Sequence, residues 1–523
     1  MDEGNIITSG IAPGGEEAKG PEQIPPPITA SEFIPETIVV PPSGADSSPT
    51  PRAVVTPPDN PFIPQGVTSQ PSQTTTAPAG VPGTGGKKSG LRKIILFLVL
   101  AVVLLGAVFL GKTFLGNFAV SQPVTLIYWG LWENESILIP VITEFESQNP
   151  QIKVEYVKQS PRQYRERLQA AMERGEGPDI FRFHNTWVPM LRKELAVAPV
   201  NIVSSAEIAA NFYPVVAADL VGGSNVYGIP MMIDGLGLYY NEDLLSAAGV
   251  SPPTTWPELL EAVPKLTVKT GETITTSAIA LGTTNNVEHF SDILATMLLQ
   301  NGAKLISPTG KEAEEALIFF RKFAEPSDPV YTWNETLDNS LAAFANGRVA
   351  MILAPSWRAL EVKQLNPNLH FKIAPIPQLP GVTITWASYW VEGVSAKSKN
   401  TQQAWEFAKF LASRNSVTKL FTAEAKVRLF GEPYALKELG SSLKDDPFLG
   451  AYIQQAATAK SFPLASRTFD NGLNDKLIKY LEDAVNGLGR GSSPQAVLET
   501  MNAGFRQVLA SYGLSTGVVP TSP

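Results

Sequence analysis

Aromatic rings stand beside short polar side chains at several places in this chain. Trp132 is followed by Glu133, and Asn185 stands two residues before Trp187. An aromatic ring presents a flat apolar face, while carboxylate, amide and guanidinium groups form hydrogen bonds with hydroxyl groups. Such side chains together suit an uncharged ligand that has both apolar faces and hydroxyl edges, as a carbohydrate has.

Several aromatic candidates for such contacts lie at or near the ends of segments that we predict to be strands, whereas Arg467 is a polar candidate from late in the chain. In sheets built from alternating strands and helices, ligand clefts lie at strand ends. For the tryptophans, packing in a hydrophobic core is the alternative interpretation. The candidate ligand-binding residues are Trp132, Glu133, Asn185, Asp234, Tyr239, Trp357, Trp386, Tyr389, Trp390 and Arg467.

The sequence gives less support to catalysis or metal binding. It has no cysteine, which excludes a thiol nucleophile and a cysteine-based metal site. Its three histidines, His184, His289 and His370, are far apart, so a histidine-rich metal centre is not expected. No GxSxG, HExxH or P-loop pattern is present. We therefore predict no catalytic residue, no metal and no cofactor.

Two other chemistries stay open as alternatives. A glycoside hydrolase needs two carboxylates beside the scissile bond, and Asp and Glu number 49 in this chain. The adjacent Tyr239 and Tyr240 resemble the paired tyrosines of ferric-ion binding proteins. Neighbouring strand residues point to opposite faces, which favours one tyrosine in the core and one at the cleft.

The segments that must position these residues alternate between strand and helix patterns. This alternation indicates βαβ units and parallel sheets. Thr255 is a suitable N-cap, with Pro257 in the first turn of the helix that follows. We predict strands at 124–130, 152–159, 179–183, 235–241, 348–356 and 371–378, and helices at 136–150, 162–177, 255–266, 290–302, 314–325, 339–347, 401–413, 417–425 and 493–513.

An uninterrupted apolar run, IILFLVLAVVLLGAVFL, occupies residues 94–110. A bilayer core of ~30 Å needs ~20 mainly apolar residues, so we predict a transmembrane anchor at 91–118. Basic residues at 87–93 precede the run, which places the N-terminus in the cytoplasm and the rest of the chain outside the cell. A cleaved signal peptide fits less well, because residues 1–93 precede the run.

The ends of the chain differ in composition from the part between them. Residues 1–90 are rich in Pro, Ser and Thr and poor in aromatic residues, which predicts a disordered cytoplasmic tail. Residues 513–523 are expected to be a flexible C-terminus. The formal net charge of -8 argues against a nucleic-acid partner.

Six motifs follow one another along residues 124–512, in the order TLIYWG, FESQNPQIKVEYV, GEGPDIF, YGIPMMIDGLGLYYNEDLL, SPPTTWPELLEA and FANGRVAMILAPSW. In this order they resemble the extracellular solute-binding proteins of ABC transporters, in the group typified by maltose-binding protein. A single motif of this kind carries little weight, but the ordered series covers the whole predicted external domain.

The resemblance implies an α/β fold of the type II periplasmic-binding-protein kind, with two lobes that close on a ligand. Lobe 1 would comprise residues 124–234 and 385–434, and lobe 2 residues 235–384 and 435–512. It also implies a monomer that captures a small-molecule solute, an oligosaccharide by this resemblance. The partners would be the lipid bilayer, through one helix, and the permease subunits of an ABC importer.

Two other functions remain as alternatives to the importer. A membrane-anchored sensor would signal from the external domain to cytoplasmic partners of the tail. A surface glycoside hydrolase would cleave an oligosaccharide that a binding protein leaves intact.

Overall fold

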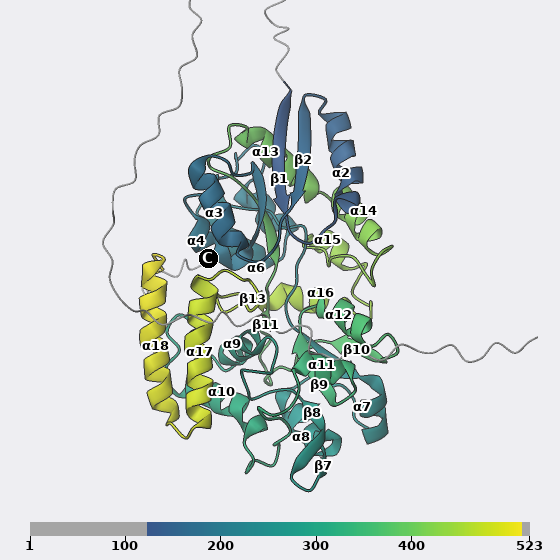
Figure 1. The fold of residues 1–523 in the computed structure, drawn as a ribbon, viewed down its shortest axis with the longest axis vertical. Coiled ribbons are helices and arrows are strands. Elements are labelled where there is room, and N and C mark those ends of the chain that lie inside the picture. The colour runs from purple at the N-terminus through teal and green to yellow at the C-terminus, as the bar shows by residue number, and fades with distance from the viewer. Residues whose placement is uncertain (1–122, 515–523) are drawn as a thin grey trace, which may run out of the picture. The chain divides into compact units, whose positions relative to one another are not determined.

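The computed structural model describes residues 123–514 (Figure 1). The predicted tail at 1–90 and the predicted anchor at 91–118 lie outside the described residues. Within 123–514, no helix combines the length and the hydropathy that a membrane span requires.

The first of two main sheets contains four strands in the order β12-β3-β1-β2. Strand β1 pairs in parallel with both β2 and β3, as the alternating pattern predicts, whereas β12 is antiparallel to β3. Helices α2 and α13 pack against this sheet, and α14 packs against these two helices (Figure 1). The elements are β1 (Val124–Gly130), β2 (Ile152–Lys158), β3 (Ile180–His184), β12 (Trp390–Val394), α2 (Glu135–Gln148), α3 (Tyr164–Arg174), α13 (Thr401–Leu411) and α14 (Arg414–Glu424).

The second sheet has the order β10-β6-β9-β8-β7 and is mixed. Only β8 and β9 are parallel, so the expectation of a parallel sheet is wrong for this lobe. The reason is that β6 enters directly from the other lobe, without the crossover helix that makes neighbouring strands parallel. The elements are β6 (Gly237–Asn241), β7 (Val268–Thr270), β8 (Thr273–Ile279), β9 (Val349–Ala354), β10 (Phe371–Ala374), α7 (Glu242–Ala248), α8 (Trp256–Leu266), α9 (Phe290–Gln300), α10 (Lys311–Arg321), α11 (Ser340–Ala345) and α12 (Arg358–Leu365).

Three chain segments cross side by side between the lobes, at residues 231–235, 386–388 and 433–435. The amide of Ser388 donates to the carbonyl of Asp234 at 2.9 Å, and the amide of Ile233 donates to the carbonyl of Pro433 at 2.9 Å. These backbone hydrogen bonds join the three segments into one connection.

Two long helices end the described chain and pack side by side (Figure 1). The first of them, α17, is not among the predicted helices, although Leu473, Leu477 and Leu481 have helical spacing and are buried. The remaining elements are α17 (Leu473–Gly489), α18 (Pro494–Ser511), η2 (Asn185–Trp187), α4 (Val188–Leu191), α5 (Ser205–Asn211), α6 (Pro214–Leu220), β4 (Val221–Gly222), β5 (Asn225–Val226), η3 (Lys322–Ala324), β11 (Thr385–Trp386), α15 (Lys437–Gly440), α16 (Gly450–Gln455), η4 (Ala456–Thr458) and β13 (Ala459–Lys460).

Candidate functional site

A cavity of about 540 Å³ lies between the two sheets, beside the crossing segments. Its volume falls in the range of ~300–1,000 Å³ that is usual for small-molecule sites. Both lobes contribute to it: Trp132 follows β1 and Trp390 begins β12, while Trp357 follows β9. We refer to this space as the central cavity.

Aromatic rings with free surface line the central cavity. Trp132, Trp357 and Phe469 are 37%, 38% and 39% exposed, so each presents a ring surface to the solvent-filled space. Trp390 lies edge-on to Trp132, with 5.5 Å between the ring centroids. Phe469 was not among the candidates, although Arg467, two residues earlier, was.

Six of the ten candidate residues line the central cavity, and four do not. The six are Trp132, Asp234, Trp357, Tyr389, Trp390 and Arg467. The other four are buried and support its walls; they are Glu133, Asn185, Tyr239 and Trp386.

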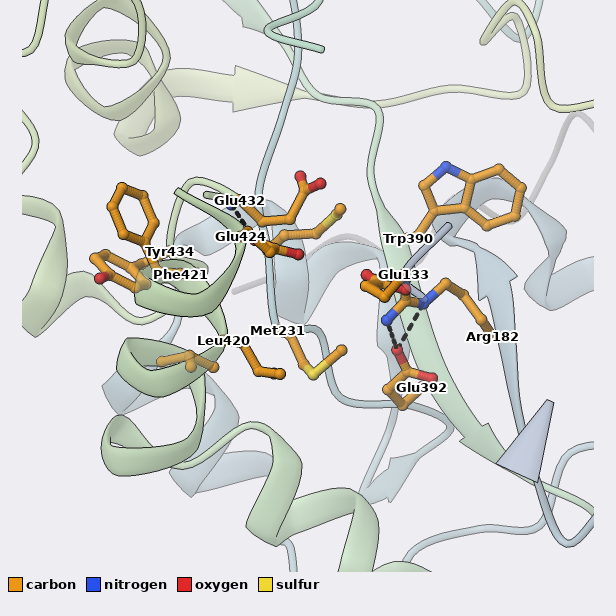
Figure 2. Close-up of a pocket in the computed structure, with 12 residues that line it drawn as sticks. Glu133, Arg182, Met231, Trp390, Glu392, Leu420, Phe421, Glu424, Glu432 and Tyr434 are labelled. Carbon is orange, nitrogen blue, oxygen red and sulfur yellow. Dashed lines mark hydrogen bonds and ion pairs between the residues drawn. The ribbon is translucent and has the colours of Figure 1, made fainter. Parts of the chain in front are cut away.

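The supporting role of Glu133 comes from a buried ion triad with Arg182 and Glu392. Figure 2 shows the guanidinium group of Arg182 between the two carboxylates, at 2.6 Å from Glu133 and 2.7 Å from Glu392. Burial acts to raise the pKa of Glu133, but Arg182 outweighs burial and lowers it, whereas burial raises the pKa of Glu392. The triad ties the segment that follows β1 to the middle of β3 and β12.

A recess of about 20 Å³ beside this triad holds no more than one or two water molecules, so it is not the ligand site. Across it, Glu424 lies near Glu432 (Figure 2). Arg428 and Glu432 both line the central cavity. Arg428 lies 2.8 Å from each carboxylate. Burial, followed by the nearby charge of Glu432, raises the pKa of Glu424 to about 8.

Asn185 and Tyr389 are held together behind the cavity. The Asn185 amide donates to Asp219 at 2.8 Å, and the Tyr389 hydroxyl donates to the same carboxylate oxygen at 2.8 Å. Asn185 is therefore engaged with the protein, while the ring of Tyr389 still contributes to the cavity wall.

Tyr239 is a core residue rather than a ligand contact. Its hydroxyl donates to the carbonyl oxygen of Pro355 at 2.5 Å, and its ring stacks on Phe371. We expected one of the two adjacent tyrosines at the cleft and named Tyr239 as the candidate. Tyr240 is half-buried and does not line the central cavity either. Among the described residues no group of three or more His, Asp or Glu side chains could hold a metal ion.

Asp234 ties the first crossing segment to the end of β9. Its carboxylate accepts hydrogen bonds from the Ser356 hydroxyl at 2.8 Å, the Ser356 amide at 3.1 Å and the Gly235 amide at 2.8 Å. Burial raises the pKa of Asp234 to about 7, and these hydrogen bonds oppose the rise.

A chain of polar contacts runs from the cavity wall to the second crossing segment. The Arg358 guanidinium donates to Nε2 of His289 at 3.0 Å, and Nδ1 of His289 lies 2.6 Å from the Ser466 hydroxyl. The Ser466 amide donates to Asp292 at 3.0 Å, and the indole of Trp386 donates to the other Asp292 oxygen at 2.8 Å.

This chain places Ser466, His289 and Asp292 together, but it is not a hydrolytic triad. A guanidinium group is only a donor, so Nε2 of His289 must accept and the ring proton sits on Nδ1. His289 then donates to Ser466 and cannot take the hydroxyl proton, as a general base must. Burial and Arg358 lower the pKa of His289 to about 3, so its ring is neutral.

Arg467 lies at the rim and is bound to Glu288. Its guanidinium reaches both carboxylate oxygens, at 2.5 and 2.6 Å, and Arg358 contacts the same carboxylate at 2.7 Å. Burial acts to raise the pKa of Glu288, but the two guanidinium groups outweigh it and lower the pKa to about 2. Arg358 is also paired with Glu361, so two guanidinium groups at this wall meet two carboxylates, which suits an uncharged ligand.

Comparison with known proteins identifies the family. Residues 130–416, more than half of the chain, match the bacterial extracellular solute-binding proteins. The protein belongs to this family. The multiple sugar-binding protein of Streptococcus mutans is 24% identical over 58% of this solute-binding protein and 73% of its own length.

Solved structures share the fold of this solute-binding protein. A cyclo/maltodextrin-binding protein complexed with maltotetraose has a TM-score of 0.61 at 19% identity, over 74% of this chain and 98% of that one. The sugar-binding protein MalE of Xanthomonas citri has a TM-score of 0.61 at 21% identity, over the same shares. The two-lobed type II periplasmic-binding-protein fold is therefore confirmed. These relatives are binding proteins, which confirms the prediction that the chain is not an enzyme.

Proposed function

We propose that this protein is the extracellular binding component of an ABC importer and captures an oligosaccharide between its lobes. The observation that carries the proposal is the central cavity, where the exposed rings of Trp132, Trp357 and Phe469 stand beside hydrogen-bonding groups. Aromatic faces cover the apolar faces of a sugar. The two guanidinium groups of Arg358 and Arg467 are balanced by the carboxylates of Glu288 and Glu361, which favours a neutral sugar.

The names of relatives support a sugar as the solute. A maltotriose-binding protein of Pyrococcus abyssi is 21% identical over 57% of this chain, and a fold neighbour was solved with mannotriose bound. We further propose that residues 91–118 anchor the protein in the cell membrane, with residues 124–512 outside as two lobes that present the solute to a permease. The protein acts as a monomer in this scheme.

Thermal stability of the full-length chain against a panel of ligands tests the proposal. A ligand that binds only the folded state adds ~2.7 kcal/mol to the unfolding free energy at a hundredfold excess over its Kd. We expect one class of oligosaccharide to raise the melting temperature, and Trp390→Ala to abolish the rise. Trp405→Phe, a change in the buried core of α13, serves as the control that retains it.

A melting temperature that rises with peptides, polyamines or metal ions, and with no sugar, would refute the proposed solute class. It would leave the assignment of the fold unchanged. Release of reducing ends from a bound oligosaccharide would instead support a hydrolase.

A further inference from the structure

A groove of about 340 Å³ adjoins the central cavity. Arg467 and Phe469 line both spaces, so a ligand in the cavity reaches the groove by passing these two side chains. We refer to it as the side groove. Its other lining residues are Arg162, Gln163, Asn471 and Asp475.

The side groove lies between elements of both lobes. Arg162 and Gln163 immediately precede α3, whereas Asn471 and Asp475 flank the start of α17. A group bound there would touch both lobes, as a group in the central cavity does.

Strained backbone is concentrated around the side groove. Among the described residues, five besides glycine have positive φ angles. A left-handed conformation costs a residue with a Cβ atom ~1–2 kcal/mol, and such strain is retained where the surroundings enforce it, often at functional sites. Four of the five line the side groove and the fifth lines the central cavity; they are Gln163, Arg467, Phe469, Asn471 and, in the cavity, His289.

Buried hydrogen bonds hold the strained segment against the first lobe. The carboxylate of Asp470 accepts from the amides of Gly472 and Asn474, each at 2.9 Å, while Arg165 of α3 donates to the carbonyl of Asp470. The side chain of Asn474 donates to the Thr186 hydroxyl at 2.8 Å. The segment is therefore fixed in place at both lobes.

The side chains of this segment alternate between the protein interior and the groove. Thr468 and Asp470 are buried, whereas Arg467, Phe469 and Asn471 are exposed and line the groove. Burial of the last three therefore does not account for their strained conformations. The strained backbone directs these three side chains, at alternate positions along the segment, into the side groove.

The exposed groups in the side groove repeat the chemistry of the central cavity. Phe469 supplies an apolar ring face, Asn471 and Gln163 supply amides, and Arg162 and Asp475 supply a charge of each sign. A ring face with planar polar groups fits a pyranose unit, which offers C–H faces and hydroxyl edges.

We propose that the side groove binds a terminal unit of the oligosaccharide, so that it sets the ligand length that the protein prefers. This proposal rests on the proposed function, since it extends the same binding site. It predicts that affinity rises with chain length until the side groove is filled.

Calorimetric titration of the full-length chain tests this, with malto-, manno-, xylo- and cello-oligosaccharides of two to six units as probes. The variant carries Arg162→Ala and Asn471→Gly, because both residues line the side groove and not the central cavity. Glycine adopts positive φ freely, so Asn471→Gly relieves strain and should not lower the melting temperature.

We expect the double variant to lose about tenfold in affinity for the longest ligand that binds and nothing for the shortest, because ~1.4 kcal/mol corresponds to a factor of ten. Trp390→Ala should weaken binding at every length. Equal losses at all lengths, or none at any length, would overturn the role of the side groove alone. Binding of no oligosaccharide by the unsubstituted chain would overturn the proposed function and this inference with it.

Discussion

At the scale of single residues, the walls of the cavity contain charges that the fold has buried. Glu424 is almost fully buried beside Glu432, and one guanidinium group, that of Arg428, serves both carboxylates. Burial of Glu424 next to a second carboxylate, with one positive charge for both, favours the protonated form of Glu424. The raised pKa of Glu424 expresses this imbalance.

Stability should therefore fall as pH rises through the raised pKa of Glu424. The folded-state pKa of Glu424 is about 8, whereas the ordinary pKa of a glutamate is 4.5. Between these two values the folded state binds more protons than the unfolded state. Excess proton binding by the folded state makes the unfolding free energy decrease with pH. The unfolding free energy should fall less between pH 7 and pH 8 in Glu424→Gln than in the unsubstituted protein. The difference should be ~1 kcal/mol, since one titrating group changes this free energy by at most ~1.4 kcal/mol per pH unit.

Urea unfolding at pH 7 and pH 8 measures the effect. The buried His184 and His289 do not obscure it, because burial lowers the pKa of each to about 3, and both rings are neutral throughout this interval. Glu438→Gln, at an exposed pair with Arg414, should leave the pH dependence as it is. An unchanged slope in Glu424→Gln would show that another group titrates.

At the scale of elements, the crossing segments decide how the lobes can move. Gly235 passes so close to the second crossing segment that a Cβ atom there would lie 1.9 Å from the carbonyl oxygen of Trp386. No side chain can shift to relieve this contact, because the obstacle is backbone. The segments are therefore packed too tightly for any residue except glycine at this position.

Gly235→Ala should destabilise the protein by ~3 kcal/mol, near the upper end for overpacking, because the crossing segments must separate. Denaturant unfolding of the variant measures the change. Gly381→Ala is the matched control, since that glycine has a φ of 79° and no atom within 4 Å of the added Cβ. It should cost only the ~1–2 kcal/mol of a left-handed alanine. Equal costs in the two variants would refute the close approach.

At the scale of the whole external part, two lobes joined by hydrogen-bonded segments are suited to hinge closure. The central cavity draws its walls from both lobes, so a ligand that contacts Trp390 and Trp357 together favours the closed arrangement. Closure and binding are then one equilibrium, and a variant that weakens one weakens the other.

Energy transfer between labels on the two lobes should change when an oligosaccharide binds. The chain has no cysteine, so Lys153→Cys on β2 and Lys311→Cys on α10 provide two unique and exposed labelling sites. We expect transfer efficiency to change with the same ligand concentration dependence as the rise in melting temperature. Trp390→Ala should shift that change to higher concentration, while constant transfer at saturation would mean that the lobes do not move.

Local structure was predictable where neighbouring residues determine it. Strand β1 begins and ends at the predicted residues, and Thr255 caps α8 in a capping box with Glu258, with Pro257 in the first turn. The predicted helix at 162–177 is α3, which Gly175 ends in the left-handed conformation, two residues before the predicted end. In each case the interacting residues are adjacent or within one turn of each other. The order of the motifs along the chain was sufficient to indicate the family.

Tertiary structure alone decided which candidates line the central cavity. Glu133 seemed as suitable as Trp132, yet Arg182, itself paired with a carboxylate 210 residues further along the chain, holds it in the wall. Phe469 lines the central cavity because the strained segment that carries it turns its side chain outward. The sequence by itself determined the elements, the family and the kinds of side chain available. The direction of each side chain depended on contacts between residues distant in the sequence, which no local pattern encodes.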